Sequence, residues 1–152
     1  MKKYMEDFNP DDFKVTKPIR LSSIDTAPAK DYDDDAKEEK LAKTSHKIAK
    51  LQEKMYANNR YAALICLQGM DTSGKDSLIR ELFNQVNPRG VVVHSFKVPN
   101  ETELQHDYLW RHYIALPEKG KIAVFNRTHY ENVLVTRVHP EYLLNENLPG
   151  IE

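Results

Sequence analysis

Residues 61–86 restrict the fold of this chain most, because an apolar run, a glycine loop and an amphipathic segment follow one another there. "YAALICL" at 61–67 is a short continuous apolar run, typical of a buried strand in a parallel sheet. "GMDTSGK" at 69–75 fits the phosphate-loop pattern G-x-x-x-x-G-K-[S/T] except at its last position, where Asp76 stands. Apolar residues at helical spacing follow at Leu78, Ile79, Leu82, Phe83 and Val86. The order strand, loop, helix predicts a phosphate site in an α/β fold.

The flanking segments predict the same class of fold. A helix is expected over about 36–58, with one stripe formed by Leu41, Ile48, Leu51 and Met55. Further strands are predicted at 91–96 and 121–125, and a crossover helix between them is opened by Asn100 as N-cap, with Glu103 three residues on. Another helix is expected within 126–139. The alternation predicts a parallel sheet with right-handed crossover helices.

The predicted organisation is an extension and leading helix at 1–58, followed by a phosphate-loop core at 59–152. Only three strands are predicted in the core, against the roughly 5–6 of a usual sheet. We therefore expect an N-terminal portion of a longer protein, incomplete at its C-terminus. A narrow sheet with open edges favours contacts with a partner.

Composition excludes several classes of protein. The 152 residues carry a formal net charge of −1, which gives no whole-molecule reason to expect DNA, RNA or an anionic membrane as partner. Cys66 is the single cysteine, so no internal disulfide can form and a reducing cytoplasm is expected. The sequence shows no signal peptide and no membrane-spanning segment. The acidic cluster at 31–40 is interpreted as a solvated extension; the alternative is a metal site at Asp31, Asp33, Asp34 and Asp35.

Phosphate chemistry at the loop is expected from its backbone and its lysine. The amide groups and the following helix N-terminus form an anion site, and Lys75 adds a mobile positive charge. The predicted phosphate-binding residues are Gly69, Met70, Thr72, Ser73, Gly74 and Asp76.

Two aspartates place negative charge in this anion site. A carboxylate beside a polyanion is repulsive unless a cation lies between them, so Asp71 is predicted to hold Mg²⁺ or to act as a base. Asp76 has two interpretations: a functional residue, or an acidic residue that suits the start of a helix. Ser77 is a weaker candidate for the missing hydroxyl.

A second group of candidates follows the third predicted strand, in "FNRTHYENVLVTRVH" at 125–139. Asn126 stands where an acidic residue often holds the metal, and Glu131 is the nearby carboxylate. Arg127 and Arg137 are predicted to neutralise charge on a transferring phosphoryl group. His129 and His139 are interpreted as structural. Arg111, in the second crossover segment, is a candidate for binding nucleotide phosphate.

The motifs "LQGMDTSGKDSLI", "NPRGVVVHSFKVPNETELQHDYLWR" and "ALPEKGKIAVFNRTHYENVLVTRVHP" resemble the family-2 polyphosphate kinases. The resemblance extends over roughly residues 10–142 and implies a thymidylate-kinase-like phosphate-loop fold. It implies that residues 59–152 are the kinase core of that fold, truncated before the family's lid. It implies Mg²⁺-dependent phosphoryl transfer between inorganic polyphosphate and ADP or AMP, with GDP and GMP as further acceptors, and a homo-oligomer.

Carried over by position, the resemblance implies metal and phosphate activation for Asp71 and a phosphate cradle for Gly74 and Lys75. Asn126 and Arg127 match the family's second motif, and Glu131 matches an acidic residue that serves the metal. The other hypotheses are an ordinary ATP-dependent nucleotide kinase and an inactive fragment that binds nucleotide or polyphosphate.

Overall fold

The structure is a computed structural model that describes residues 11, 14–24, 33–146 and 148–150. The chain divides into two compact units, residues 1–40 and 41–152. The described part of the first unit holds a 3-10 helix, Leu21–Ser23, and the start of α1, Asp34–Asn58. Since the second unit begins at Leu41, α1 is shared between the two units, and the boundary after residue 58 stays a prediction.

The proposed acidic metal site falls in the first unit. Asp31 lies outside the described residues, and Asp34 is paired with Lys37 at 2.8 Å. That ion pair lowers the pKa of the Asp34 carboxyl through its hydrogen bond with Lys37. Within the described ranges, no group of three or more histidine, cysteine, aspartate or glutamate side chains is placed to hold a metal ion.

The second unit is built on three parallel strands in the order β1-β3-β2. Their bounds are Ala63–Leu67 for β1, Val91–Ser95 for β2 and Ile122–Asn126 for β3. The register aligns the last residues of all three strands, Leu67, Asn126 and Ser95. The predicted parallel α/β sheet is confirmed, and its topology places three strand ends side by side at one edge, where ligands bind in such folds.

The strand predicted as buried over 61–67 is only half-buried. It begins at Ala63, and its side chains alternate between partly buried and exposed, with Leu64 41% exposed. The reason is its position at the edge of the described sheet, whereas all five residues of the central β3 are buried.

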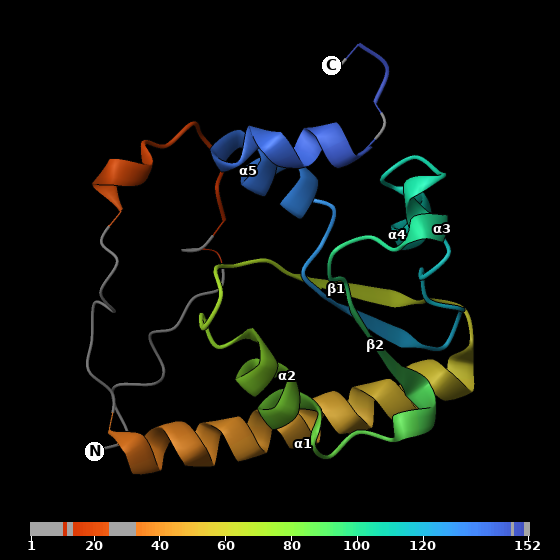
Figure 1. Cartoon of the computed structure of the whole chain (residues 1–152). Helices are drawn as coiled ribbons and strands as arrows, with labels where there is room; N and C mark the ends of the chain where they lie inside the picture. The colour runs from red at the N-terminus through yellow and green to blue at the C-terminus, as the bar shows by residue number, and fades with distance from the viewer. Residues whose placement is uncertain (1–10, 12–13, 25–32, 147, 151–152) are drawn as a thin grey trace. The chain divides into compact units, whose positions relative to one another are not determined.

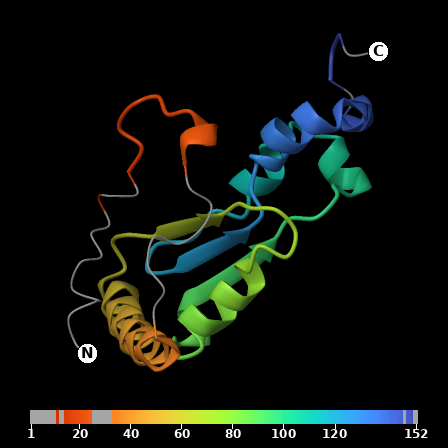
Figure 2. The ribbon, with the colours of Figure 1, turned by 90° about the vertical axis from the view of Figure 1, so that its left-hand side faces the viewer.

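Helices cover both faces of the sheet (Figures 1 and 2). The α1 segment of this unit and α2, Lys75–Phe83, lie on one face. The short helices α3, Glu101–Leu104, and α4, Trp110–Tyr113, lie on the other. The core on the second face consists of Phe96, Ala123 and Phe125, with the His112 ring 4.1 Å from the Phe96 ring. This alternation along β3 leaves Asn126 on the same face as Val124, toward α2.

Three of the four residues of the predicted apolar stripe of α1, Leu41, Ile48 and Met55, are partly buried, and two polar residues are buried with them. Leu51 is 64% exposed, while Ser45 and Gln52 are buried. The Ser45 hydroxyl donates to the carbonyl oxygen of Glu81 at 3.0 Å. Gln52 fills the space over Gly90, where a Cβ atom would lie 1.6 Å from the Gln52 nitrogen. Any side chain at position 90 would therefore require the Gln52 side chain to move.

The single crossover helix predicted after Asn100 is instead two short helices, α3 at Glu101–Leu104 and α4 at Trp110–Tyr113. The predicted capping box of Asn100 and Glu103 is present. The helix breaks because the Asp107 side chain accepts the Leu109 amide hydrogen at 2.9 Å, and its carbonyl accepts that of Trp110 at 2.8 Å. These bonds begin a new turn instead of continuing the first helix.

The remaining elements are two 3-10 helices, Pro88–Gly90 and Pro140–Glu146, and helix α5, Glu131–Val138. The helix expected within 126–139 thus begins five residues after β3 ends. Among the described helices, none combines the length and apolar character required to span a membrane.

Candidate active site

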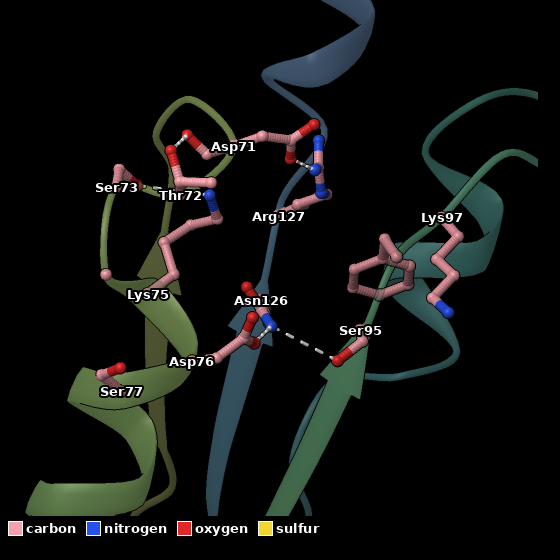
Figure 3. Close-up of a pocket in the computed structure, with 12 residues that line it drawn as sticks. Asp71, Thr72, Ser73, Lys75, Asp76, Ser77, Ser95, Lys97, Asn126 and Arg127 are labelled. Carbon is pink, nitrogen blue, oxygen red and sulfur yellow. Dashed lines mark hydrogen bonds and ion pairs between the residues drawn. The ribbon is translucent and has the colours of Figure 1, made fainter.

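A pocket of about 490 Å³ lies at the carboxyl ends of the three strands (Figure 3). Three segments form its walls: the loop and first turn of α2, the end of β2, and the end of β3. The lining residues are Asp71, Thr72, Ser73, Gly74, Lys75, Asp76, Ser77, Ser95, Phe96, Lys97, Asn126 and Arg127.

The loop after β1 presents the start of α2 to this pocket. Gly74 has φ +89°, a left-handed conformation that glycine adopts without steric cost, and α2 begins at the next residue. The free amide groups of the first turn, together with the helix dipole, make this helix end suited to an anion. Thr72 is also left-handed, at φ +63°, so the loop folds back tightly over four residues.

Lys75 currently binds the loop itself. Its ammonium group donates to the carbonyl oxygens of Gly69 at 2.8 Å and Met70 at 2.7 Å, and to the Ser73 hydroxyl at 3.3 Å. These are neutral acceptors, and phosphate oxygens would be stronger ones. Gly69 and Met70 therefore position the lysine by their carbonyl groups and do not line the pocket.

Arg127 joins the two carboxylates that the sequence proposes as metal ligands. One guanidinium nitrogen is paired with Asp71 and another lies 3.1 Å from Glu131. The Asp71 side chain lines the pocket and is 80% exposed. The Glu131 side chain is 18% exposed and does not line the pocket. The guanidinium thus occupies the space between these carboxylates, so a cation shared by both would require Arg127 to move.

Asn126 and Asp76 form a second polar pair, at the base of the pocket (Figure 3). The Asn126 amide nitrogen donates to the Asp76 carboxylate at 2.6 Å and to the Ser95 hydroxyl at 3.5 Å. Its carbonyl oxygen, Oδ1, is buried without a hydrogen-bond partner. Such an oxygen beside a carboxylate fits a hard cation, because Mg²⁺ prefers oxygen ligands. Asp76 thus lines the pocket and has a partner on β3, and its functional role stays a prediction.

Besides Gly69, Met70 and Glu131, two further predicted site residues, Arg111 and Arg137, do not line the pocket. Arg111 is buried in α4, where it donates to the Lys97 carbonyl oxygen at 2.8 Å and to Glu103 at 3.3 Å. Arg137 is exposed near the end of α5, six residues beyond Glu131. The structure brings neither one to the phosphate loop.

Three residues that the sequence did not assign to the site contribute to it. Ser95 ends β2 and Lys97 lies across the pocket from Lys75 (Figure 3). Gln68 connects the loop to the end of β3 through three hydrogen bonds. All three directly end or follow a predicted strand, so the rule that ligands bind at the carboxyl ends of parallel strands was the available signal.

Known proteins are similar to this chain in sequence and in fold. The family described as "Polyphosphate kinase 2 (PPK2)" matches residues 31–146. An ADP-polyphosphate phosphotransferase of Rhodopseudomonas palustris is 51% identical over 106 residues, which are 70% of this chain and 37% of that protein. An AMP/ADP-polyphosphate phosphotransferase of Meiothermus ruber is 52% identical over 100 residues, 66% of this chain and 38% of that protein.

The structural comparison agrees. The crystal structure of polyphosphate kinase 2 from Arthrobacter aurescens TC1 superposes with a TM-score of 0.75 and 33% identity, covering 84% of this chain and 47% of that one. The chain therefore spans less than half the length of these relatives. The family match over residues 31–146 covers more than half of the chain and settles the relationship: the chain belongs to the polyphosphate kinase 2 family.

Proposed function

We propose that this chain carries the phosphate-loop half of a Mg²⁺-dependent phosphotransferase that moves a phosphoryl group between inorganic polyphosphate and a nucleoside mono- or diphosphate. The relatives that support this proposal are named as phosphotransferases between polyphosphate and ADP, AMP or GDP. The homo-oligomeric state stays a prediction.

The observation that carries the proposal is the arrangement of charges around the pocket. Positively charged side chains lie on three sides: Lys75 at the start of α2, Arg127 after β3 and Lys97 after β2. The carboxylates of Asp71 and Asp76 lie between them. A site that brings two polyanions together needs positive charge on both, and it needs carboxylates that recruit further cations.

The chain's own residues have separable tasks in this proposal. The α2 amide groups and Lys75 bind phosphate oxygens of one substrate. Arg127 leaves Asp71 and binds the oxygens on which negative charge accumulates during transfer. Mg²⁺, when bound, would neutralise phosphate charge, with Asp71, Asp76 and the Asn126 oxygen as the candidate holders.

The deciding experiment measures ATP formation from long-chain polyphosphate and ADP or AMP in the presence of Mg²⁺. The wild-type chain is compared with its Asp71→Asn variant and with a longer protein that contains this chain. We expect Asp71→Asn to lower turnover roughly 100-fold, because it keeps the shape of the side chain but removes the charge that recruits the cation. Its melting temperature should not change, since the side chain is exposed.

Other outcomes separate the alternatives. ATP formed only by the longer protein would make this chain a binding half that is inactive alone. Nucleotide phosphorylation with ATP as the only effective donor would replace the proposal with an ordinary nucleotide kinase. Unchanged turnover in Asp71→Asn at saturating Mg²⁺ would remove Asp71 from the site.

A further inference from the structure

Gln68 is the residue that joins the phosphate loop to the end of β3. It follows directly after β1, and its side chain points across the strand ends. Its carbonyl oxygen accepts hydrogen bonds from the Thr128 amide at 3.1 Å and from the Thr128 hydroxyl at 2.9 Å. Its amide nitrogen donates to Glu131 at 2.9 Å. One side chain therefore binds both backbone and side chain beyond β3.

The orientation of this amide is fixed by its partners. The Thr128 backbone amide can only donate, and the Glu131 carboxylate can only accept when ionised. Turning the amide over would set its N–H groups against the Thr128 amide and its oxygen against the Glu131 carboxylate, so both of these contacts would be lost. Thr128 is fully buried, so the oxygen end of Gln68 is anchored where water does not compete.

The backbone between these anchors is strained at Arg127. Its φ is +65°, a left-handed conformation that is unfavourable for a residue with a side chain. Such a conformation persists only where its surroundings hold it. The Arg127 amide donates to the Leu67 carbonyl oxygen at 3.0 Å, and the next residue, Thr128, is held by Gln68. The backbone amides of Arg127 and Thr128, on either side of the strained Arg127 Cα atom, are thus bound to Leu67 and Gln68 at the end of β1.

The same amide also fixes the carboxylate that holds the arginine side chain. A single Glu131 oxygen accepts from Gln68 at 2.9 Å and from Arg127 at 3.1 Å. Arg127 in turn contacts Asp71 through its other nitrogen. Exposure rises along this series from the buried Thr128 to the exposed Asp71. The anchored end can remain in place while Arg127 exchanges Asp71 for a phosphate oxygen.

We propose that Gln68 is a positioning residue, which sets the direction of the Arg127 guanidinium by holding the left-handed turn and the Glu131 carboxylate together. The consequence for turnover rests on the proposed function; the consequence for the order of the Arg127 side chain does not.

The direct test measures the order of the Arg127 side chain by ¹⁵N relaxation of its Nε–H group. We compare the wild-type chain with Gln68→Leu, which removes all three bonds, and with Gln68→Glu, which keeps the shape and the acceptor for Thr128 but places a like charge beside Glu131. The exposed Gln85, changed to Leu, is the control. The order parameter S² should fall below about 0.6 in both Gln68 variants and stay at its wild-type value in the control. Unchanged order in folded Gln68→Glu, or equal loss in Gln85→Leu, would overturn the proposal.

Turnover provides the second measurement, as a double-mutant cycle. Gln68→Leu should lower kcat roughly 10- to 100-fold, the range expected when a supporting residue lets a catalytic group shift by about an ångström. In an Arg127→Ala background the same change should have no further effect, whereas with Lys75→Ala the two losses should multiply. A Gln68 effect that persists without Arg127 would contradict positioning. Loss of Arg127 order in a chain whose longer form shows no polyphosphate turnover would support positioning and contradict the proposed function.

Discussion

Two of the three pocket walls are held in different ways: the first wall, which is the loop after β1, and the second wall, which is the segment after β3. The loop at 69–74 is exposed and is held mainly by its own carbonyl groups, through Lys75. The segment after β3 is largely buried and is held by side chains of other elements, with Asn126 bound to Asp76 and Thr128 bound to Gln68. Both walls contain a left-handed residue that is not glycine, Thr72 in one and Arg127 in the other.

The difference indicates a division of tasks. The loop's contacts involve neutral acceptors near water, so they can be exchanged for phosphate oxygens at little cost. The contacts after β3 are shielded and shared among several residues, so that wall is formed before a ligand binds. Preformed groups stabilise a transition state without reorganisation during the reaction. We therefore expect changes in the two walls to separate activity from stability.

The largest expected effects come from removing the positively charged side chains of Arg127 and Lys75. Arg127→Ala should lower turnover roughly 1,000-fold and Lys75→Ala roughly 100-fold, because each removes charge stabilisation of a transferring phosphoryl group. Their effects on stability should differ. Lys75→Ala should change the free energy of unfolding by less than about 0.5 kcal/mol, while Arg127→Ala should cost about 1 kcal/mol by leaving Glu131 less paired. Turnover assays and urea unfolding measure both quantities.

A matched variant tests whether the second wall is strained. Arg127→Gly removes the same guanidinium but relieves the left-handed φ, so it should be as inactive as Arg127→Ala and more stable by roughly 1 kcal/mol. Equal stability of the two variants would show that the backbone there stores no strain.

A smaller effect is expected from Asn126→Asp, which places a second carboxylate beside Asp76. The amide nitrogen that donates to Asp76 at 2.6 Å is lost, and two like charges meet in a nearly buried site. We expect a loss of about 1–3 kcal/mol in the free energy of unfolding at neutral pH. Repulsion should raise the pKa of the introduced carboxyl at position 126 in the folded state above its unfolded value. The loss of stability should therefore shrink as the pH is lowered.

Added Mg²⁺ sharpens this prediction. A cation bound between the two carboxylates should restore the melting temperature of Asn126→Asp in proportion to its occupancy. Asn87→Asp is the control, since its side chain accepts a hydrogen bond from the Arg89 amide at 3.0 Å, which aspartate preserves. Equal behaviour of the two variants with Mg²⁺ would argue against a cation site at Asn126 and Asp76.

The smallest predicted effect concerns His112, whose ring packs near those of Phe96 and Phe125. Burial lowers the pKa of this imidazole, and the neighbouring positive charges of Arg111 and His129 lower it further, against the Tyr108 carbonyl and Glu103. The neutral form is therefore favoured in the folded state. Stability from this group is complete above the unfolded pKa near 6.5 and falls as the pH drops below it.

Thermal unfolding between pH 7.5 and 5.5 measures this effect. His112→Phe keeps a ring against Phe96, 4.1 Å away in the wild type, and should reduce the fall in melting temperature at acidic pH. His46→Gln, on the exposed side of α1, should leave the fall unchanged. An identical pH dependence for His112→Phe would assign the loss to other groups.

The local elements were predictable because their signals lie close together in the sequence. The strand, glycine loop and helix of residues 61–86 follow a short-range pattern, and the Asn100 capping box depends on two residues three apart. The errors have local or tertiary causes. The second crossover helix is broken at Asp107 by a side chain that competes for backbone hydrogen bonds. Leu51 is the one exposed residue of the predicted α1 stripe, and the buried positions of that helix are Ser45 and Gln52.

The site was predictable in its residue types and only partly in its membership. Asp71, Lys75, Asn126 and Arg127 do line or face one pocket. Arg111 and Arg137 do not, since a helix can direct a charged side chain inward to a local carboxylate or outward to water. Gln68 was missed because a single glutamine has no pattern of its own; its function appears only when its partners, 60 and 63 residues away, are known.

The sequence by itself determined the family, the phosphate loop and the parallel α/β class, since all three depend on residues that are neighbours in the chain. The tertiary structure decided which strand lies in the middle and which carboxylate meets which cation. Placing β3 between β1 and β2 brings Asn126 to Asp76 and Arg127 to Asp71. These contacts join residues 50 and 56 positions apart, and only the packing of the sheet gives them a common location.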